Sequence, residues 1–144
     1  MLIEPITYVC ATQNRVDSMK RNFDKILPWV DRAIIVDGGS RDSTKELCLS
    51  LAPKVEYRFR EWSDSFCDQY NHFLYGVDNG WVIILDDDEL PSDEMLVGLR
   101  QLVSESDHGE NYSVVEFRAR PISEGQDLGA SNYYRQLLVR WTPN

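Results

Sequence analysis

Cysteine, long apolar runs and a leader-like start are scarce or missing in this sequence. Its three cysteines, Cys10, Cys48 and Cys67, are odd in number and far apart, so neither a disulfide framework nor a zinc motif is visible. We expect them to be buried, reduced thiols in a cytosolic protein. No apolar stretch approaches the ~20 residues of a membrane span. Residues 1–5 lack a basic region and a long apolar core, so we expect no signal peptide.

Basic charge is also in deficit. The 24 Asp and Glu residues outnumber the 15 Lys and Arg residues, which gives a formal net charge of −9. This sign disfavours nucleic acid or an anionic membrane as the partner of the whole surface. A local phosphate site remains compatible with it, because a bound metal ion reverses the sign of the charge around it.

Short apolar runs alternate with amphipathic segments along the chain. The pattern predicts strands at residues 6–11, 33–36, 55–59 and 81–85, helices at 17–27, 43–51, 65–77 and 91–103, and two later strands at 112–120 and 133–141. Such alternation is typical of a parallel sheet with helices on both faces. We therefore expect an α/β fold with a mostly parallel sheet, in a single domain over residues 1–144.

The most informative stretch is an apolar run, residues 81–85, that ends in four consecutive acids at residues 86–89. Carboxylates packed this closely repel one another, and a divalent cation relieves the repulsion. On an extended backbone Asp86 and Asp88 would point to one side, roughly 6.6 Å apart along the chain, and Asp87 would point away. Oxygen ligands of this kind suit Mg²⁺ or Mn²⁺. The alternative is a solvated helix start, since acids favour helix N-termini.

Two more polar clusters follow predicted strands. Residues 12–14 come after the first strand, and residues 37–40 come after the second. Because right-handed crossovers bring the carboxyl ends of parallel strands to one edge, we expect these clusters to meet the acids there. A nucleotide-type pocket is the economical interpretation. Taken alone, Asp37 could equally be a turn residue before two glycines.

Four segments resemble motifs of the family 2 glycosyltransferases of GT-A fold, in the family's order, and closest to the subgroup that acts on bacterial cell-surface glycans. They cover about residues 6–100. The resemblance implies a GT-A fold, which is a Rossmann-like, mostly parallel sheet that binds a nucleoside-diphosphate sugar. The segments are the turn Thr12-Gln13-Asn14-Arg15, the second-strand signature at residues 36–44, the helix start Phe66-Cys67-Asp68-Gln69-Tyr70-Asn71, and the acidic strand end at residues 81–89.

The resemblance also implies roles for individual residues. The implied metal ligand is Asp88, and the implied donor-binding residues are Thr12, Asn14, Asp37, Gln69, Asn71, Asp86 and Asp87. Among these, Asp37 would hold the base of the nucleotide. Two positions depart from the family pattern, because Gln13 stands where an aromatic residue is frequent and Tyr70 replaces the usual arginine. No residue matches the family's general base, so the catalytic residue stays unassigned.

The function implied by the resemblance is metal-dependent, inverting transfer of a sugar from a nucleoside-diphosphate sugar, with a UDP-sugar favoured, to a glycan or lipid-linked acceptor. The cofactor would be Mn²⁺ or Mg²⁺. In the family the general base comes later than Asn144, so we expect the donor-binding part of a longer enzyme, truncated at its C-terminus and with an incomplete acceptor side. An unpaired sheet edge would then favour self-association.

Two other functions stay open from the sequence. One is a non-catalytic nucleotide-sugar-binding fragment that lacks the general base. The other is a nucleotidyltransferase, although the glycine-rich phosphate loop typical of that class is missing at residues 11–15. We expect a cytoplasmic protein, either free or peripheral at the inner face of a membrane, with no nucleic-acid partner and no transmembrane segment.

Overall fold

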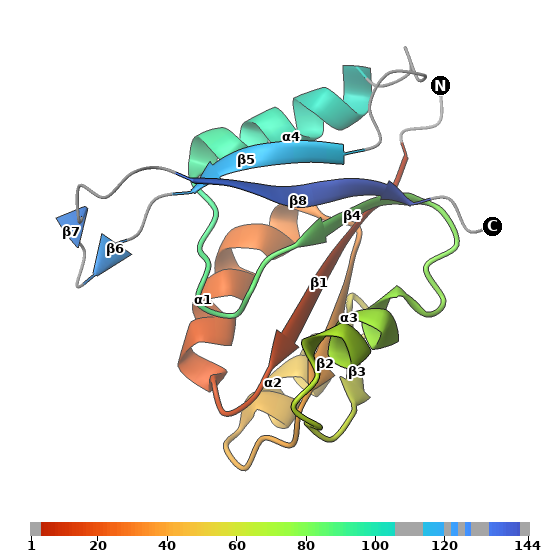
Figure 1. Cartoon of the computed structure of the whole chain (residues 1–144), viewed down its shortest axis with the longest axis vertical. Coiled ribbons are helices and arrows are strands. Elements are labelled where there is room, and N and C mark those ends of the chain that lie inside the picture. Colours follow the sequence, from red (N-terminus) through yellow and green to blue (C-terminus); the bar gives the residue numbers. More distant parts are fainter. Residues whose placement is uncertain (1–3, 106–113, 120–121, 124–125, 128–132, 142–144) are drawn as a thin grey trace.

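The architecture is one main sheet with helices on both of its faces (Figure 1). The computed structural model describes residues 4–105, 114–119, 122–123, 126–127 and 133–141. In these ranges, no helix combines the length and the apolar character that crossing a membrane requires.

The main sheet has the strand order β3-β2-β1-β4-β8-β5. Its first four strands run parallel: β1 (Ile6–Thr12), β2 (Arg32–Asp37), β3 (Val55–Phe59) and β4 (Gly80–Ile84). β8 (Tyr133–Trp141) pairs antiparallel with β4, and β5 (Val114–Ala119) pairs antiparallel with β8, so β5 points the same way as β1. The mostly parallel sheet is therefore confirmed. A small separate ladder of β6 (Ile122–Ser123) and β7 (Gln126–Asp127) was not predicted.

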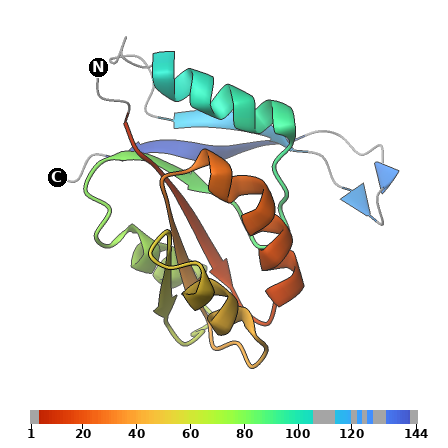
Figure 2. The same cartoon turned by 180° about the vertical axis from the view of Figure 1, so that it is seen from behind.

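Both faces of the sheet are covered. The helical elements are α1 (Val16–Ile26), the 3₁₀ turn η1 (Leu27–Trp29), α2 (Thr44–Ser50), α3 (Phe66–Leu74) and α4 (Asp93–Glu105). α1, α2 and α4 pack on one face and bury residues such as Met19, Cys48 and Leu99, whereas α3 buries Phe73 on the other face. Figure 1 has α3 in front of the sheet, and Figure 2 shows α1 and α2 on the face behind it.

The central strands are apolar on both sides because each side meets a helix. Tyr8 and Cys10 of β1 belong to the larger core, and Val9 between them belongs to the smaller one. Successive side chains of a strand point to opposite faces, so a strand covered twice loses the alternation of apolar and polar residues. This is why the run at residues 81–85 was recognisable as a buried strand.

Helix α3 differs from the prediction at both ends. It stops at Leu74, where Tyr75 leaves the helical conformation and Gly76 adopts a positive φ of 75°. The Arg58 guanidinium donates to the His72 carbonyl at 2.7 Å and so satisfies this end of the helix. At the other end, Phe66 shares the apolar spacing of the helix but lies outside the core, because its side chain is 66% exposed.

The cysteines follow the expectation in two of three cases. Cys10 and Cys48 are buried and Cys67 is exposed, and none of the three forms a disulfide. Burial, together with the nearby charge of Asp37, raises the pKa of the Cys48 thiol to about 12. Cys48 is therefore an inert packing residue.

Candidate functional site

The carboxyl ends of the parallel strands meet along one edge of the sheet, as the sequence predicted. Thr12 ends β1 and is in register with Asp37, which ends β2. β4 lies on the opposite side of β1, and β3 lies beyond β2. We call the loops after these four strands the carboxyl edge. Along it lie, in spatial order, the connection after β3, the glycine turn after β2, the turn after β1 and the acidic turn after β4.

Asn14 joins the turn after β1 to the turn after β2. Its backbone N–H donates to the Ser40 Oγ at 2.7 Å, and its side-chain Oδ1 accepts from the Arg41 N–H at 2.7 Å. Asn14 reaches this position with a φ of 55°, a left-handed conformation that asparagine tolerates better than most residues. The Gln13 amide adds a bond to the Gly38 carbonyl at 3.3 Å. The two turns are thus one connected unit.

Asp37 organises the glycine turn from inside. Its Oδ1 accepts from the N–H groups of Gly39 and Ser40 at 3.0 and 2.8 Å and from the Ser40 hydroxyl at 2.8 Å. Its Oδ2 accepts from the Tyr57 hydroxyl at 3.0 Å, and only 1% of the residue is exposed. Burial and this contact with Asp37 raise the pKa of Tyr57 to about 12. The carboxylate therefore fixes the shape of the turn.

Asp42 holds the first residues of two helices. Its Oδ2 accepts from the Val16 N–H of α1 at 3.0 Å. Its Oδ1 accepts from the Thr44 N–H at 3.0 Å and from the Thr44 hydroxyl at 2.5 Å, at the start of α2. Burial acts to raise the pKa of Asp42, but the hydrogen bonds from Thr44 and Val16 outweigh it and lower the pKa. Asp42 thus takes over the capping of both helices, whose own N-cap residues, Arg15 and Ser43, make no side-chain cap bond.

The four acids after β4 form a turn, which corrects the extended geometry expected from the sequence. β4 ends at Ile84, and the Glu89 N–H donates to the Asp86 carbonyl at 3.1 Å. The Glu89 carboxylate in turn accepts from the Asp86 N–H at 2.9 Å. The buried amide of Asn22 in α1 donates to the carbonyls of Asp86 and Asp87 at 3.4 and 3.2 Å. The turn is thereby anchored to the first helix.

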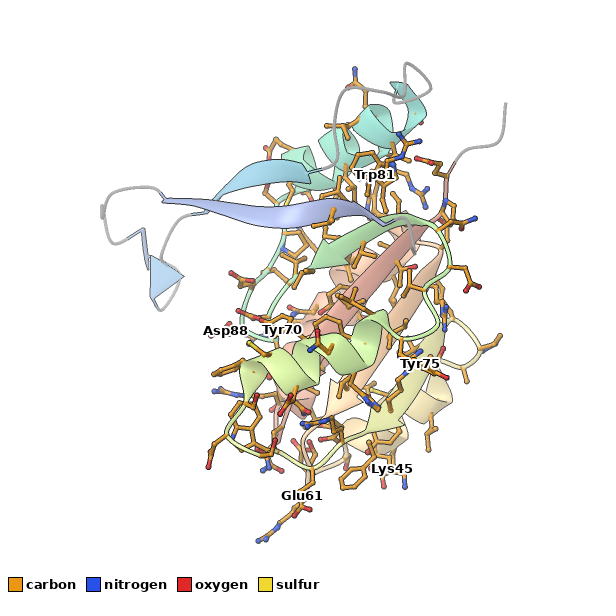
Figure 3. All side chains as sticks on the ribbon, turned by 45° about the vertical axis from the view of Figure 1, so that its right-hand side comes forward. Lys45, Glu61, Tyr70, Tyr75, Trp81 and Asp88 are labelled. Atoms are coloured by element: carbon orange, nitrogen blue, oxygen red, sulfur yellow. The ribbon has the colours of Figure 1, made fainter. Side chains whose placement is uncertain are left out.

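Each acid of the turn has its own surroundings. The Asp86 Oδ1 accepts from the Tyr70 hydroxyl at 2.9 Å, and the Asp87 Oδ2 accepts from the Thr12 hydroxyl at 2.8 Å. Asp88 is exposed. Asp87, expected to point away from the site, instead reaches back to the end of β1. Figure 3 shows Asp88 and Tyr70 at this edge, and Tyr75 at the far end of α3.

The pKa of Asp87 is raised, chiefly by partial burial and to a lesser extent by the charges of Asp88 and Asp86. The Thr12 hydroxyl and the Arg15 guanidinium act in the opposite direction. A carboxylate with a raised pKa beside two other acids marks a place where extra positive charge is stabilising.

The residues at this edge fit a cation that is shared with a ligand. No group of three or more His, Cys, Asp or Glu side chains in the described part of the chain is arranged to hold a metal ion by itself. Mg²⁺ and similar ions are commonly held by one or two carboxylates, with waters and substrate phosphates completing the shell. An exposed Asp88 next to Asp86 offers that kind of donor set.

The α3 residues are divided by the structure. Gln69 is only 1% exposed, and its amide both donates to the Arg60 carbonyl at 3.1 Å and accepts from the Arg60 guanidinium at 2.8 Å. It therefore ties α3 to the connection after β3. Asn71 is exposed, and Tyr70, noted in the sequence only for replacing an arginine, contacts the acidic turn.

Sequence reasoning missed two residues that shape the edge: Asn22 and Tyr57. Asn22 carried a signal, because it is a polar residue among Met19, Phe23 and Ile26 on the buried face of α1. Such a residue must find hydrogen-bond partners, and it does so in the acidic turn. Tyr57 carried no such signal.

Known proteins show the same arrangement of elements. S. aureus TarS, residues 1–349, superposes with a TM-score of 0.60 at 14% identity over 94% of this chain and 47% of that one. The structure of TarS 1–349 in complex with UDP-GlcNAc superposes with a TM-score of 0.58 at 16% identity, over 72% of this chain and 32% of that one. A third structure is glucosyl-3-phosphoglycerate synthase from Mycobacterium tuberculosis in complex with Mn²⁺, UDP and phosphoglyceric acid. It superposes with a TM-score of 0.59 at 18% identity, over 77% of this chain and 42% of that one. The fold is the GT-A fold.

Sequence comparison assigns the family. A TPR repeat-containing protein of Synechococcus elongatus is 26% identical over 84 residues, which are 58% of this chain and 20% of that protein. The chain thus spans about a fifth of this relative and less than half of each solved structure named above. Residues 7–142 match the family described as glycosyl transferase family 2. The chain therefore belongs to glycosyl transferase family 2.

Proposed function

We propose that this chain binds the donor of a metal-dependent, inverting glycosyltransferase, and that the donor is a nucleoside-diphosphate sugar, with UDP as the favoured nucleotide. The observation that carries the proposal is the connected carboxyl edge. There the Thr12 hydroxyl at the end of β1 bonds Asp87 of the acidic turn, and Asp88 stands exposed beside it. The family match and the similar structures that contain UDP-GlcNAc, or UDP with Mn²⁺, support the choice of ligand.

Asp88 is the proposed metal ligand, with Asp86 beside it and Mn²⁺ or Mg²⁺ as the ion. When bound, the ion would neutralise charge on the leaving diphosphate. The chain's own residues prepare this position. Asn22 fixes the backbone of the acidic turn, and Tyr70 orients the Asp86 carboxylate.

The nucleoside is proposed to lie over the ends of β1 and β2. Thr12 and Asn14 would line it, and Asp37 would hold the base. Because the Asp37 carboxylate is buried and accepts four hydrogen bonds within the protein, we propose that it acts on the base mainly through the turn it shapes. Asn71 is exposed and would face the donor sugar, and Gln69 would support it by holding α3 in place.

The acceptor side is proposed from the family alone. A general base would deprotonate the hydroxyl of a glycan or lipid-linked acceptor, and inversion at the anomeric carbon would follow. None of the residues described at the carboxyl edge is assigned this role. Peripheral membrane attachment, a cytoplasmic location and self-association are further proposals that the described edge does not bear on.

Isothermal titration calorimetry tests the proposal. The protein is titrated with UDP in the presence of Mn²⁺ and, separately, in the presence of a chelator. We expect Mn²⁺ to strengthen UDP binding and Asp88→Ala to abolish that metal-dependent gain, leaving only the weaker binding measured in chelator, while thermal unfolding stays unchanged. Asp78→Ala is the matched control, because Asp78 is an exposed acid in the loop before β4, at the opposite end of the strands.

Three results would decide against parts of the proposal. No binding of UDP, GDP or TDP at millimolar concentration with Mn²⁺ would reject donor binding. Tight binding by Asp88→Ala would reject the metal assignment. Donor binding by the full-length natural protein without transfer or donor hydrolysis would favour a binding module over an enzyme.

A further inference from the structure

An aromatic cluster lies on the carboxyl edge outside the residues assigned so far. Trp62 belongs to the connection between β3 and α3, and its ring meets that of Phe66 edge-on, with centroids 4.8 Å apart. Phe59, the last residue of β3, is 61% exposed, and Phe66 is similarly open to solvent, whereas Trp62 is half-buried. We call Phe59, Trp62 and Phe66 the aromatic wall. Large apolar side chains that stay exposed together are unusual and commonly mark a binding surface.

The aromatic wall borders the glycine turn after β2. A Cβ placed on Gly38 would lie 3.4 Å from the Trp62 Cβ, and one placed on Gly39 would lie 3.8 Å from the Phe59 ring. The backbone N–H of Trp62 also donates to the Gly38 carbonyl at 3.2 Å. On the other side of the turn lies Gln13, 3.6 Å from the same Gly38 position. The turn therefore has an amide on one side and aromatic rings on the other.

The Trp62 ring is held in place by the protein itself. Its indole N–H donates to the Asp64 Oδ1 at 2.9 Å. Asp64 reaches that position with a φ of 56°, a left-handed conformation that few residues other than glycine adopt. With the Phe66 contact, this fixes the ring before any ligand arrives. A fixed ring loses little conformational freedom when a ligand stacks on it.

We propose that Trp62 stacks on the base of the bound nucleoside diphosphate, an inference that rests on the proposed function. The order of the loops favours this ligand. The acidic turn at β4 takes the diphosphate end, and neighbouring strands are ~4.8 Å apart, so the connection after β3 lies ~14 Å along the edge. An elongated ligand with its phosphates at the acids directs its base toward β2 and β3. Gln13 offers no ring to that base, and Trp62 does.

Three ligands separate a base contact from other effects in calorimetric titrations. UDP with Mn²⁺ reports the whole nucleotide, uridine reports the nucleoside, and Mn²⁺ with pyrophosphate reports the phosphate end. Trp62→Leu removes the aromatic ring and keeps an apolar side chain, whereas Trp62→Phe keeps a ring. Tyr75→Leu is the matched control, because Tyr75 is 81% exposed at the opposite end of α3 (Figure 3).

We expect Trp62→Leu to weaken the binding of UDP and of uridine by similar factors, ~5- to 100-fold, which is the range for loss of base–aromatic stacking in other proteins. Pyrophosphate binding stays unchanged, Trp62→Phe stays within about threefold of the parent protein because it retains an aromatic face, and Tyr75→Leu has no effect. Unchanged uridine affinity in Trp62→Leu overturns the inference. This holds even if Trp62→Leu loses sugar transfer, because that loss would place the ring at the acceptor and not at the base. Equal loss of pyrophosphate binding also overturns it, because the residue is then structural. If the parent protein binds none of the three ligands, the proposed function itself fails.

Discussion

Replacement of Asp42 by alanine tests the account of how the carboxyl edge is held together. The carboxylate accepts from the Val16 N–H at the start of α1 and from the Thr44 N–H and hydroxyl at the start of α2. Loss of a helix N-cap typically costs ~1 kcal/mol and at most ~2 kcal/mol. Because Asp42 serves two helices, we expect the free energy of unfolding to fall by ~2–4 kcal/mol. For a domain of this size that lowers Tm by roughly 6–14 °C.

The dependence on pH has a definite sign. Hydrogen bonding lowers the pKa of Asp42 in the folded protein, so its contribution is complete above the unfolded-state value of ~3.9. The contribution is lost as the pH falls through the lower folded-state pKa. The difference in stability between the parent protein and Asp42→Ala should therefore be constant near neutral pH and shrink below about pH 4.

Urea unfolding at several pH values, followed by circular dichroism, measures both effects. Asp24→Ala is the control, because Asp24 is an exposed acid within α1 that is outside the cap. Asp42→Asn, which keeps an acceptor oxygen without the charge, should fall between the parent protein and Asp42→Ala. A loss no larger than that of Asp24→Ala would refute the double-cap reasoning.

Three further substitutions have defined outcomes. Asp37→Ala removes the charged hydrogen bonds that shape the glycine turn, each worth ~1.5–3 kcal/mol, so the binding of uridine and of UDP in chelator should weaken roughly tenfold to a hundredfold, and an unchanged Kd in calorimetry would leave Asp37 without a part in nucleoside binding. Thr12→Val should lower the free energy of unfolding by ~1–3 kcal/mol, because the half-buried Asp87 carboxylate loses its hydroxyl donor, and identical urea midpoints would contradict this. Asn22→Leu should release the acidic turn and weaken Mn²⁺-dependent UDP binding more than it weakens uridine binding, and equal weakening of both would contradict the anchoring role.

The order of strands and helices was predictable because both faces of the sheet are covered. Apolar runs such as residues 33–36 and 81–85 lack the alternation of apolar and polar residues that a strand with one solvent-exposed face shows. The amphipathic segments between these runs supply the helices that cover both faces. The meeting of three polar turns at one edge followed from the parallel direction of the strands, which brings their carboxyl ends to the same side of the sheet. The direction of β8 did not follow, since an apolar strand pattern is the same in either orientation.

Contacts between residues that are distant in the sequence could not be predicted from local pattern. Asn22 and Asp87 are 65 positions apart, and Asp42 reaches Val16 across 26 positions. Local sequence pattern does not show that one carboxylate holds the starts of two helices. The turn at residues 86–89 was missed for a similar reason. Repulsion among the four acids indicates that a cation is favourable there, but it does not determine the backbone conformation. The hydrogen bonds with Asn22 and Glu89 determine that conformation.

Paramagnetic broadening by Mn²⁺ in ¹H–¹⁵N correlation spectra tests the central claim most directly. With UDP and substoichiometric Mn²⁺, we predict loss of the amide signals of residues 86–89 and 12–15, shifted signals for residues 38–40, and unaffected signals for residues 75–79 at the opposite end of the strands. Asp88→Ala should abolish the broadening and keep the shifts caused by UDP. Broadening centred away from the acidic turn, or shifts caused by UDP outside the carboxyl edge, would contradict the account.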